Sequence, residues 1–170
     1  MLLFVGDPHG NLVTVKETVF FLKSEVIFFL GDQCLENPID LILSNISSLV
    51  YFILNNHNSD HPHWPENHLS AWEQCLNCKT VEVGGQKIAE LGGVFIEGIW
   101  HLHTGVKWKN RECYIHHTPP EHRFKNRLLL GHWTSIFPED FKKLLNVGNA
   151  DILITHQAPE CHQYGFKGIG

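Results

Sequence analysis

The stretch LLFVGDPHG, residues 2–10, joins a short apolar run to a turn that carries two potential metal ligands, Asp7 and His9. Residues 2–5 are apolar throughout, which predicts a buried strand, and Gly6 permits a tight turn at the end of that strand. Side chains two residues apart in an extended stretch point to the same side. We therefore expect Asp7 and His9 to face one site at the end of the first strand.

The same arrangement recurs three more times along the chain. Apolar runs over residues 26–30, 49–54 and 151–155 lead, respectively, to Asp32, to Asn56 with His57, and to His156. Ligands of open α/β sheets bind outside the carboxyl ends of the strands. Four neighbouring strand ends would bring one set of side chains to a single point: Asp7, His9, Asp32, Asn56 and His156.

Segments with helical character separate the first three apolar runs. Residues 11–23 carry apolar side chains at helical spacing, and Pro38 opens a second helical stretch that extends to residue 47. The alternation of strand and helix predicts an α/β fold with parallel strands and crossover helices. Farther along, the pattern predicts a long loop, antiparallel hairpins and a helix, over residues 55–70, 80–118 and 138–145.

Length and composition limit the class of protein. The 170 residues, 43% hydrophobic and 18% charged, suit one globular domain over residues 1–170. The net charge of −5 provides no broad basic field, so a long nucleic acid is not an expected partner. No apolar run reaches the ~18 residues of a membrane span. Five cysteines without an export signal favour a reducing cytoplasm.

The ligand types at the strand ends indicate a catalytic metal site. Carboxylate, amide and imidazole groups without a thiolate suit a manganese, iron or zinc ion of a catalytic site better than they suit a structural, cysteine-rich zinc site. A carboxylate such as Asp32 can bridge two ions, and two ions clamp a phosphate and activate water. Each Gly-Asp pair alone is an ordinary turn, and His156 alone is an ordinary buried histidine. The recurrence at four strand ends favours the metal site.

The order of these groups resembles a known family. Its motifs are D-x-H, G-D, N-H and a later histidine, and here they are Asp7-x-His9, Gly31-Asp32, Asn56-His57 and Thr155-His156. The chain resembles the calcineurin-like metallophosphoesterases over nearly its whole length. The resemblance implies an α/β fold of two packed mixed β-sheets flanked by helices. It also implies hydrolysis of phosphomonoesters or phosphodiesters by a hydroxide bound to a dinuclear metal centre.

The resemblance assigns roles to individual residues. Asp7 and His9 would hold the first metal, Asp32 would bridge, and Asn56 and His156 would hold the second. His57 would assist catalysis beside Asn56, and His162 would lie on the substrate side. The two divalent ions would be manganese, with iron, zinc, nickel or cobalt as alternatives. The partner would be a small phosphorylated substrate or a phosphoprotein, with no membrane involved.

The chain departs from the family pattern at three places. Asn58 stands where the family has an acidic residue, so it carries no charge to stabilise a protonated His57. Leu35 replaces the second aspartate of G-D-x-x-D, and the closing G-H-x-H motif is absent. We therefore expect a domain that is C-terminally incomplete, truncated before the last metal-ligand motif. The alternative function is a catalytically impaired remnant that binds metal or a partner without turnover.

Two further patterns have open interpretations. Cys75 and Cys78 form a C-x-x-C pair that is either a metal or redox motif or two ordinary thiols. Basic residues gather loosely between residues 107 and 127. They predict either a solvated hairpin face or a small patch for an anionic substrate.

Overall fold

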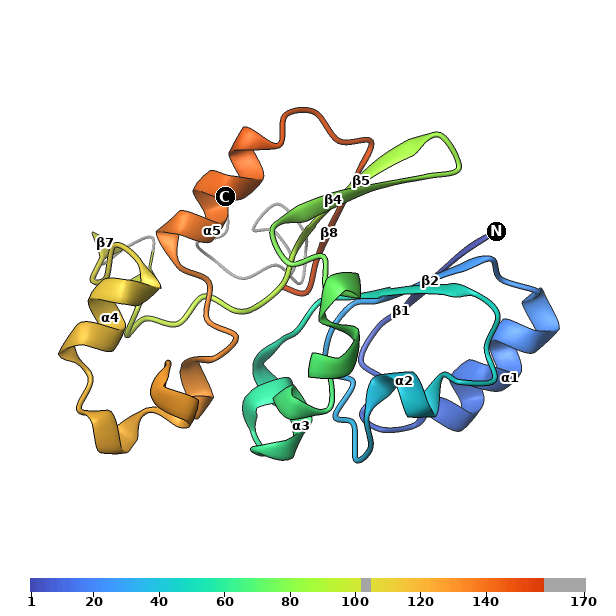
Figure 1. The fold of residues 1–170 in the computed structure, drawn as a ribbon. Helices are drawn as coiled ribbons and strands as arrows, with labels where there is room; N and C mark the ends of the chain where they lie inside the picture. The colour runs from blue at the N-terminus through green and yellow to red at the C-terminus, as the bar shows by residue number, and fades with distance from the viewer. Residues whose placement is uncertain (102–104, 158–170) are drawn as a thin grey trace.

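The computed structural model describes residues 1–101 and 105–157, and its first half is built on a parallel sheet. The strands are β1 (Leu2–Val5), β2 (Val26–Phe29) and β3 (Leu49–Phe52), in the order β1-β2-β3. The helices α1 (Leu12–Leu22) and α2 (Ile39–Ile42) connect them (Figure 1). The predicted strand–helix alternation is therefore confirmed, although α2 is much shorter than the expected stretch.

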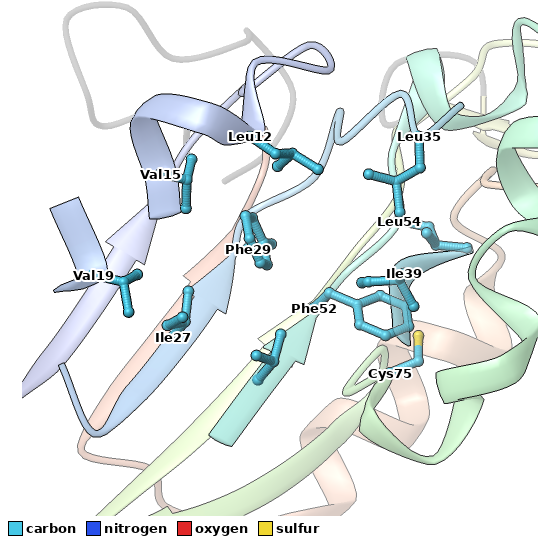
Figure 2. Packing of buried hydrophobic residues seen from close by; sticks show 11 residues of the cluster. Leu12, Val15, Val19, Ile27, Phe29, Leu35, Ile39, Phe52, Leu54 and Cys75 are labelled. Atoms are coloured by element: carbon cyan, nitrogen blue, oxygen red, sulfur yellow. The ribbon is translucent and has the colours of Figure 1, made fainter. Parts of the chain in front are cut away.

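The central strand β2 is buried on both faces, which explains its continuous apolar sequence. Ile27 and Phe29 pack into one apolar cluster, which also receives Val15 and Val19 of α1 (Figure 2). Val26 and Phe28 face the opposite side and join a second cluster. Alternate side chains of one strand thus hold a helix on one face and other strands on the other.

A second sheet contains β4 (Lys79–Val83), β5 (Gln86–Leu91) and β8 (Ile152–Thr155). The pair Gly84-Gly85 turns β4 into β5, as the sequence predicted, and β8 pairs with β5 in parallel. From the sequence we expected β8 to lie beside the first three strands, and this was wrong. Ile88 of β5 and Ile154 of β8 pack against Phe28 of β2, so the second cluster joins the two sheets.

The remainder is largely helical. A short ribbon of β6 (Trp100–His101) and β7 (Gly105–Val106) is followed by α4 (Arg111–His117), where hairpins were predicted. The carboxamide of Asn110 accepts a hydrogen bond from the backbone N–H of Cys113 and caps this helix. Tyr114 of α4 packs with Phe137 in a third cluster. The helix α5 (Pro138–Asn146) confirms the predicted one.

The predicted long loop over residues 55–70 contains short helical turns instead. They are η1 (Asn56–Ser59), α3 (His63–Glu66) and η2 (Leu69–Gln74), and three further turns, η3 (Pro120–His122), η4 (Phe124–Asn126) and η5 (Leu130–His132), precede α5. The architecture is therefore mixed α/β, with two small sheets and helices. Within the described ranges, no helix has the length and apolar composition needed to cross a membrane.

Candidate metal centre

Three of the predicted ligands meet where strands of both sheets end. Asp7 follows β1, Asp32 follows β2 and His156 follows β8, and their ligand atoms all lie within 4.8 Å of one another. Nδ1 of His156 is 3.5 Å from Oδ1 of Asp7, and its Nε2 is 3.6 Å from Oδ2 of Asp32. One imidazole therefore lies between two carboxylates. His156 approaches from the second sheet, and its Nδ1 lies 3.2 Å from the carbonyl oxygen of Leu30.

The turns that carry the carboxylates have left-handed backbone conformations. The φ angles are 44° at Asp7, 52° at Asp32 and 108° at Gly31. A β-carbon at Gly31 would lie 2.0 Å from Nδ2 of Asn55, so only glycine fits at this position. The backbone N–H of His9 donates to the carbonyl of Asp32 at 3.0 Å and holds the first two turns together.

The buried side chain of Asn58 connects the second and third turns. Its Oδ1 accepts the backbone N–H of Asp32 at 3.0 Å and that of Asn55 at 2.9 Å. Its Nδ2 donates to Oε1 of Gln33, whose Nε2 donates in turn to the carbonyl of Ile53 at 3.0 Å. All of these polar groups are removed from water, so each bond contributes more than it would on the surface. Asn58, which departs from the calcineurin-like pattern, thus has a definite structural role.

His57 has a carboxylate partner that the sequence analysis missed. Nδ1 of His57 lies 2.6 Å from Oδ2 of Asp60, three residues later in the same helical turn. This hydrogen bond, more than any other contact, raises the pKa of the imidazole. Asn58 supplies no charge to a protonated His57, as expected from the sequence, but Asp60 does. The backbone N–H of His57 donates to Oδ1 of Asp32 at 3.2 Å, which connects this pair to the ligand group.

Burial dominates the electrostatics of Asp32. It raises the pKa of the carboxyl group, while the charges of His156 and His57 act in the opposite direction and that of Asp7 adds to the rise. Asp7 is more exposed, with 57% of its side chain accessible against 4% for Asp32. The site therefore has one carboxylate in the protein interior and one at its mouth. An added cation would stabilise the ionised form of both.

The other predicted site residues lie at the margin of this group or beyond the described chain. His9 is outside the three-residue group: its Nδ1 lies 3.7 Å from Sγ of Cys34, and its ring centroid is 5.4 Å from that of His57. Asn56 begins η1 beside the group, and its carboxamide makes no hydrogen bond to the described residues. His162 lies outside the described residues.

The C-x-x-C pair belongs to a different part of the molecule. Cys75 is buried in the cluster of Figure 2, beside Phe52. Burial raises the thiol pKa to about 11 at Cys75 and about 12 at Cys78. Thiols with such pKa values stay protonated near neutral pH and are poor nucleophiles and ligands. Of the two interpretations of this pair, two ordinary thiols fits better than a metal or redox motif.

Comparison with known proteins gives one relationship of substantial length. The chain is 33% identical over 175 residues to an uncharacterized protein of Haemophilus influenzae, and the match covers 99% of this chain and 75% of that protein. No family model matches the chain. No solved structure matches it. At this identity and coverage, the chain belongs to the same family as the uncharacterized H. influenzae protein.

Proposed function

We propose that the protein is a metal-dependent phosphoesterase of the calcineurin-like type, which hydrolyses phosphomonoesters or phosphodiesters with two divalent ions. The observation that carries the proposal is the meeting of Asp7, Asp32 and His156 at strand ends that are remote in sequence. The finer description of the fold, two mixed sheets packed face to face and flanked by helices, is part of the same proposal. The apolar cluster shared by both sheets supports it.

The donor set fits a divalent ion. Protein ligands bind such an ion at about 2.0–2.2 Å, so two atoms on one ion lie at most about 4.4 Å apart. The group formed by Asp7, Asp32 and His156, within 4.8 Å, needs only a small closure to meet that limit. Manganese is the first choice, and iron, zinc, nickel and cobalt accept the same ligands. His9 and Asn56, the other two predicted ligands, would complete the dinuclear site around Asp32.

His57 would serve as the proton donor. When bound, the ions neutralise the charge of a phosphate ester and activate water for attack. Asp60 orients the imidazole of His57 and stabilises its protonated form through the 2.6 Å contact. His57 is 47% exposed, so its free edge can reach the leaving-group oxygen of a substrate at the mouth of the site. Asp60 acts through His57 and is a positioning residue.

The proposed substrate is a small phosphorylated molecule or a phosphoprotein, because both present a phosphate to an open site. Asp7 and His57 are the exposed members, and a compact anionic group reaches them without a deep channel. We also propose a cytoplasmic location. Four free cysteines among the described residues support a reducing compartment.

Metal binding and hydrolysis are measured separately in the test. Calorimetric titration with Mn²⁺ compares the full chain with Asp32→Asn and with Asp40→Asn, an exposed control that keeps its bond to Ser70. Asp32→Asn should lower the Mn²⁺ affinity by more than about tenfold, since it removes a direct ligand. Asp40→Asn should leave it unchanged. Hydrolysis of p-nitrophenyl phosphate and its bis ester should follow the same order and disappear with EDTA.

A second variant tests the proton donor. Asp60→Asn should leave Mn²⁺ affinity intact but lower kcat by about 10–100-fold, less than the full contribution of a general acid. Its pH profile should lose the limb set by His57. Mn²⁺ binding without turnover in the folded wild type would favour the catalytically impaired alternative. An Mn²⁺ affinity that Asp32→Asn leaves unchanged would refute the proposed site.

A further inference from the structure

A cavity of about 350 Å³ lies away from the candidate metal centre, lined by residues of η2, β4, α4 and α5 and by Arg127, Leu128 and Trp133. The side chains that matter for its chemistry are two indoles and four cations: Trp72, Trp133, Lys79, Arg111, Arg127 and Lys143. The proposed metal ligands do not line it. Its volume falls within the range of small-molecule sites.

The two acidic residues of the wall share one arginine, which offsets one of their two negative charges. Nη1 of Arg111 donates to Oδ1 of Asp140 at 2.6 Å and to Oε1 of Glu139 at 3.1 Å. Its Nη2 donates to the carbonyl of Ser135 at 3.1 Å. Asp140 also accepts the backbone N–H of Phe137 through its other oxygen. This network fixes one side of the cavity and leaves one net negative charge on that wall.

The other three cations of the cavity have no carboxylate within ion-pair distance among the described residues. Lys79, Arg127 and Lys143 form no ion pair with the described acidic residues, and the ammonium group of Lys79 donates only to the carbonyl of Cys75 at 2.8 Å. The four cations of the lining outnumber its two carboxylates, and the net charge of +2 favours an anionic ligand even though the chain as a whole has a net charge of −5.

The indoles add a second recognition element. Trp72 is 43% exposed and lines the cavity, so its ring is accessible to a ligand. The guanidinium of Arg127 lies 5.8 Å from the ring centroid of Trp133, close enough for a cation–π contact. Flat aromatic surface beside fixed positive charge suits a planar ring that carries an anionic group.

We propose that this cavity binds a small aromatic anion, a planar ring bearing a phosphate or carboxylate group, at a site separate from the metal centre. The ring lies against Trp72 and Trp133, and the anionic group is bound by Lys79, Arg127 and Lys143. The inference does not depend on the phosphoesterase proposal, because it uses none of the residues assigned there. Of the two interpretations of the basic residues between 107 and 127, this proposal favours the patch for an anionic ligand, and it adds Lys143 of α5 to that patch.

Isothermal titration calorimetry of the full chain with AMP in EDTA tests the proposal. Lys143→Gln removes a cavity charge, and Lys142→Gln removes an exposed charge one residue away that does not line the cavity. AMP should bind, and Lys143→Gln should weaken it by about tenfold, the size of one charge-assisted hydrogen bond. Lys142→Gln should match the wild type. Inorganic phosphate alone and adenosine alone should each bind more weakly than AMP.

Further experiments identify the chemical groups of the ligand that the cavity recognises. Trp72→Leu should weaken AMP but not phosphate, because it removes only the aromatic contact. Benzoate that displaces AMP would assign a carboxylate ligand, and failure to displace would assign a phosphate ligand. Absence of AMP binding up to about 1 mM, or equal losses in the two lysine variants, would overturn the proposal. AMP binding that both lysine variants leave unchanged would place the ligand elsewhere and overturn it too.

Discussion

Glu90 provides a quantitative test of the packing between the two sheets. It lies in the central strand β5, is 1% exposed, and neither carboxylate oxygen has a hydrogen-bond partner among the described residues. Its cross-strand neighbour Lys79 donates to the carbonyl of Cys75 instead. Burial alone raises the pKa of Glu90 from 4.5 to about 8. The carboxyl group is therefore neutral in the folded protein at pH 7 and ionised in the unfolded chain.

The sign of the pH dependence follows from this difference. Between pH 4.5 and pH 8 the folded state retains a proton that the unfolded state has lost, so the free energy of unfolding falls as the pH rises. Each pKa unit corresponds to 1.36 kcal/mol. The native state is destabilised by about 3 kcal/mol at pH 7, and by less than 1 kcal/mol near pH 5. Glu90→Gln keeps the shape and removes the titration.

Urea unfolding at pH 5 and pH 8 measures this effect. The difference in unfolding free energy between Glu90→Gln and wild type should grow by about 3 kcal/mol from the lower to the higher pH. Glu73→Gln, an exposed change of the same kind, should show no such growth. A difference that is the same at both pH values would show that Glu90 is ionised or solvated in the fold. That result would refute the reasoning from burial.

Three further predictions use stability as the measurement. Burial lowers the pKa of His68 to about 4, so stability should fall by about 3 kcal/mol as the pH drops from 6.5 to 4; acid titration of wild type against His68→Gln checks this, and parallel curves would contradict it. Gly31→Ala should cost about 2–3 kcal/mol in thermal unfolding because of Asn55, whereas Gly84→Ala, also left-handed but open, should cost only about 1 kcal/mol. Arg111→Met should cost about 3 kcal/mol in urea unfolding, since it leaves two carboxylates of α5 unpaired; a loss below about 1 kcal/mol would show that the network is not structural.

The first half of the fold was predictable because its signals are local. Apolar runs alternate with segments that have helical spacing. A strand that is buried on both faces has a continuous apolar sequence, which is easily recognised. The sheet to which β8 belongs was not predictable in this way. A buried parallel strand has the same sequence signature whichever sheet it joins, and the pairing of β8 with β5 depends on contacts between residues about 64 positions apart, such as Ile88 and Ile152.

The candidate site was likewise predictable from the sequence only in part. Asp7, Asp32 and His156 were predicted from strand ends, and the structure brings them together. Asp60 was missed because its contact with His57 requires a helical turn inside a segment that looked like a loop. The spacing of three residues between a histidine and an aspartate was the available signal. The helix α4 was missed for a similar reason, although Asn110 followed by Glu112 is a helix-start pattern.

The link between Asn58 and Gln33 has a consequence for the evolution of the family. Asn58 both accepts, from two backbone N–H groups, and donates, to Oε1 of Gln33. An ionised aspartate at position 58 would keep the acceptor and lose the donor, and a glutamine at position 33 would then have to turn its amide around. Turning it would leave the carbonyl of Ile53 without its donor. The identities of residues 33 and 58 should therefore change together among homologues, so that either one forecasts the other.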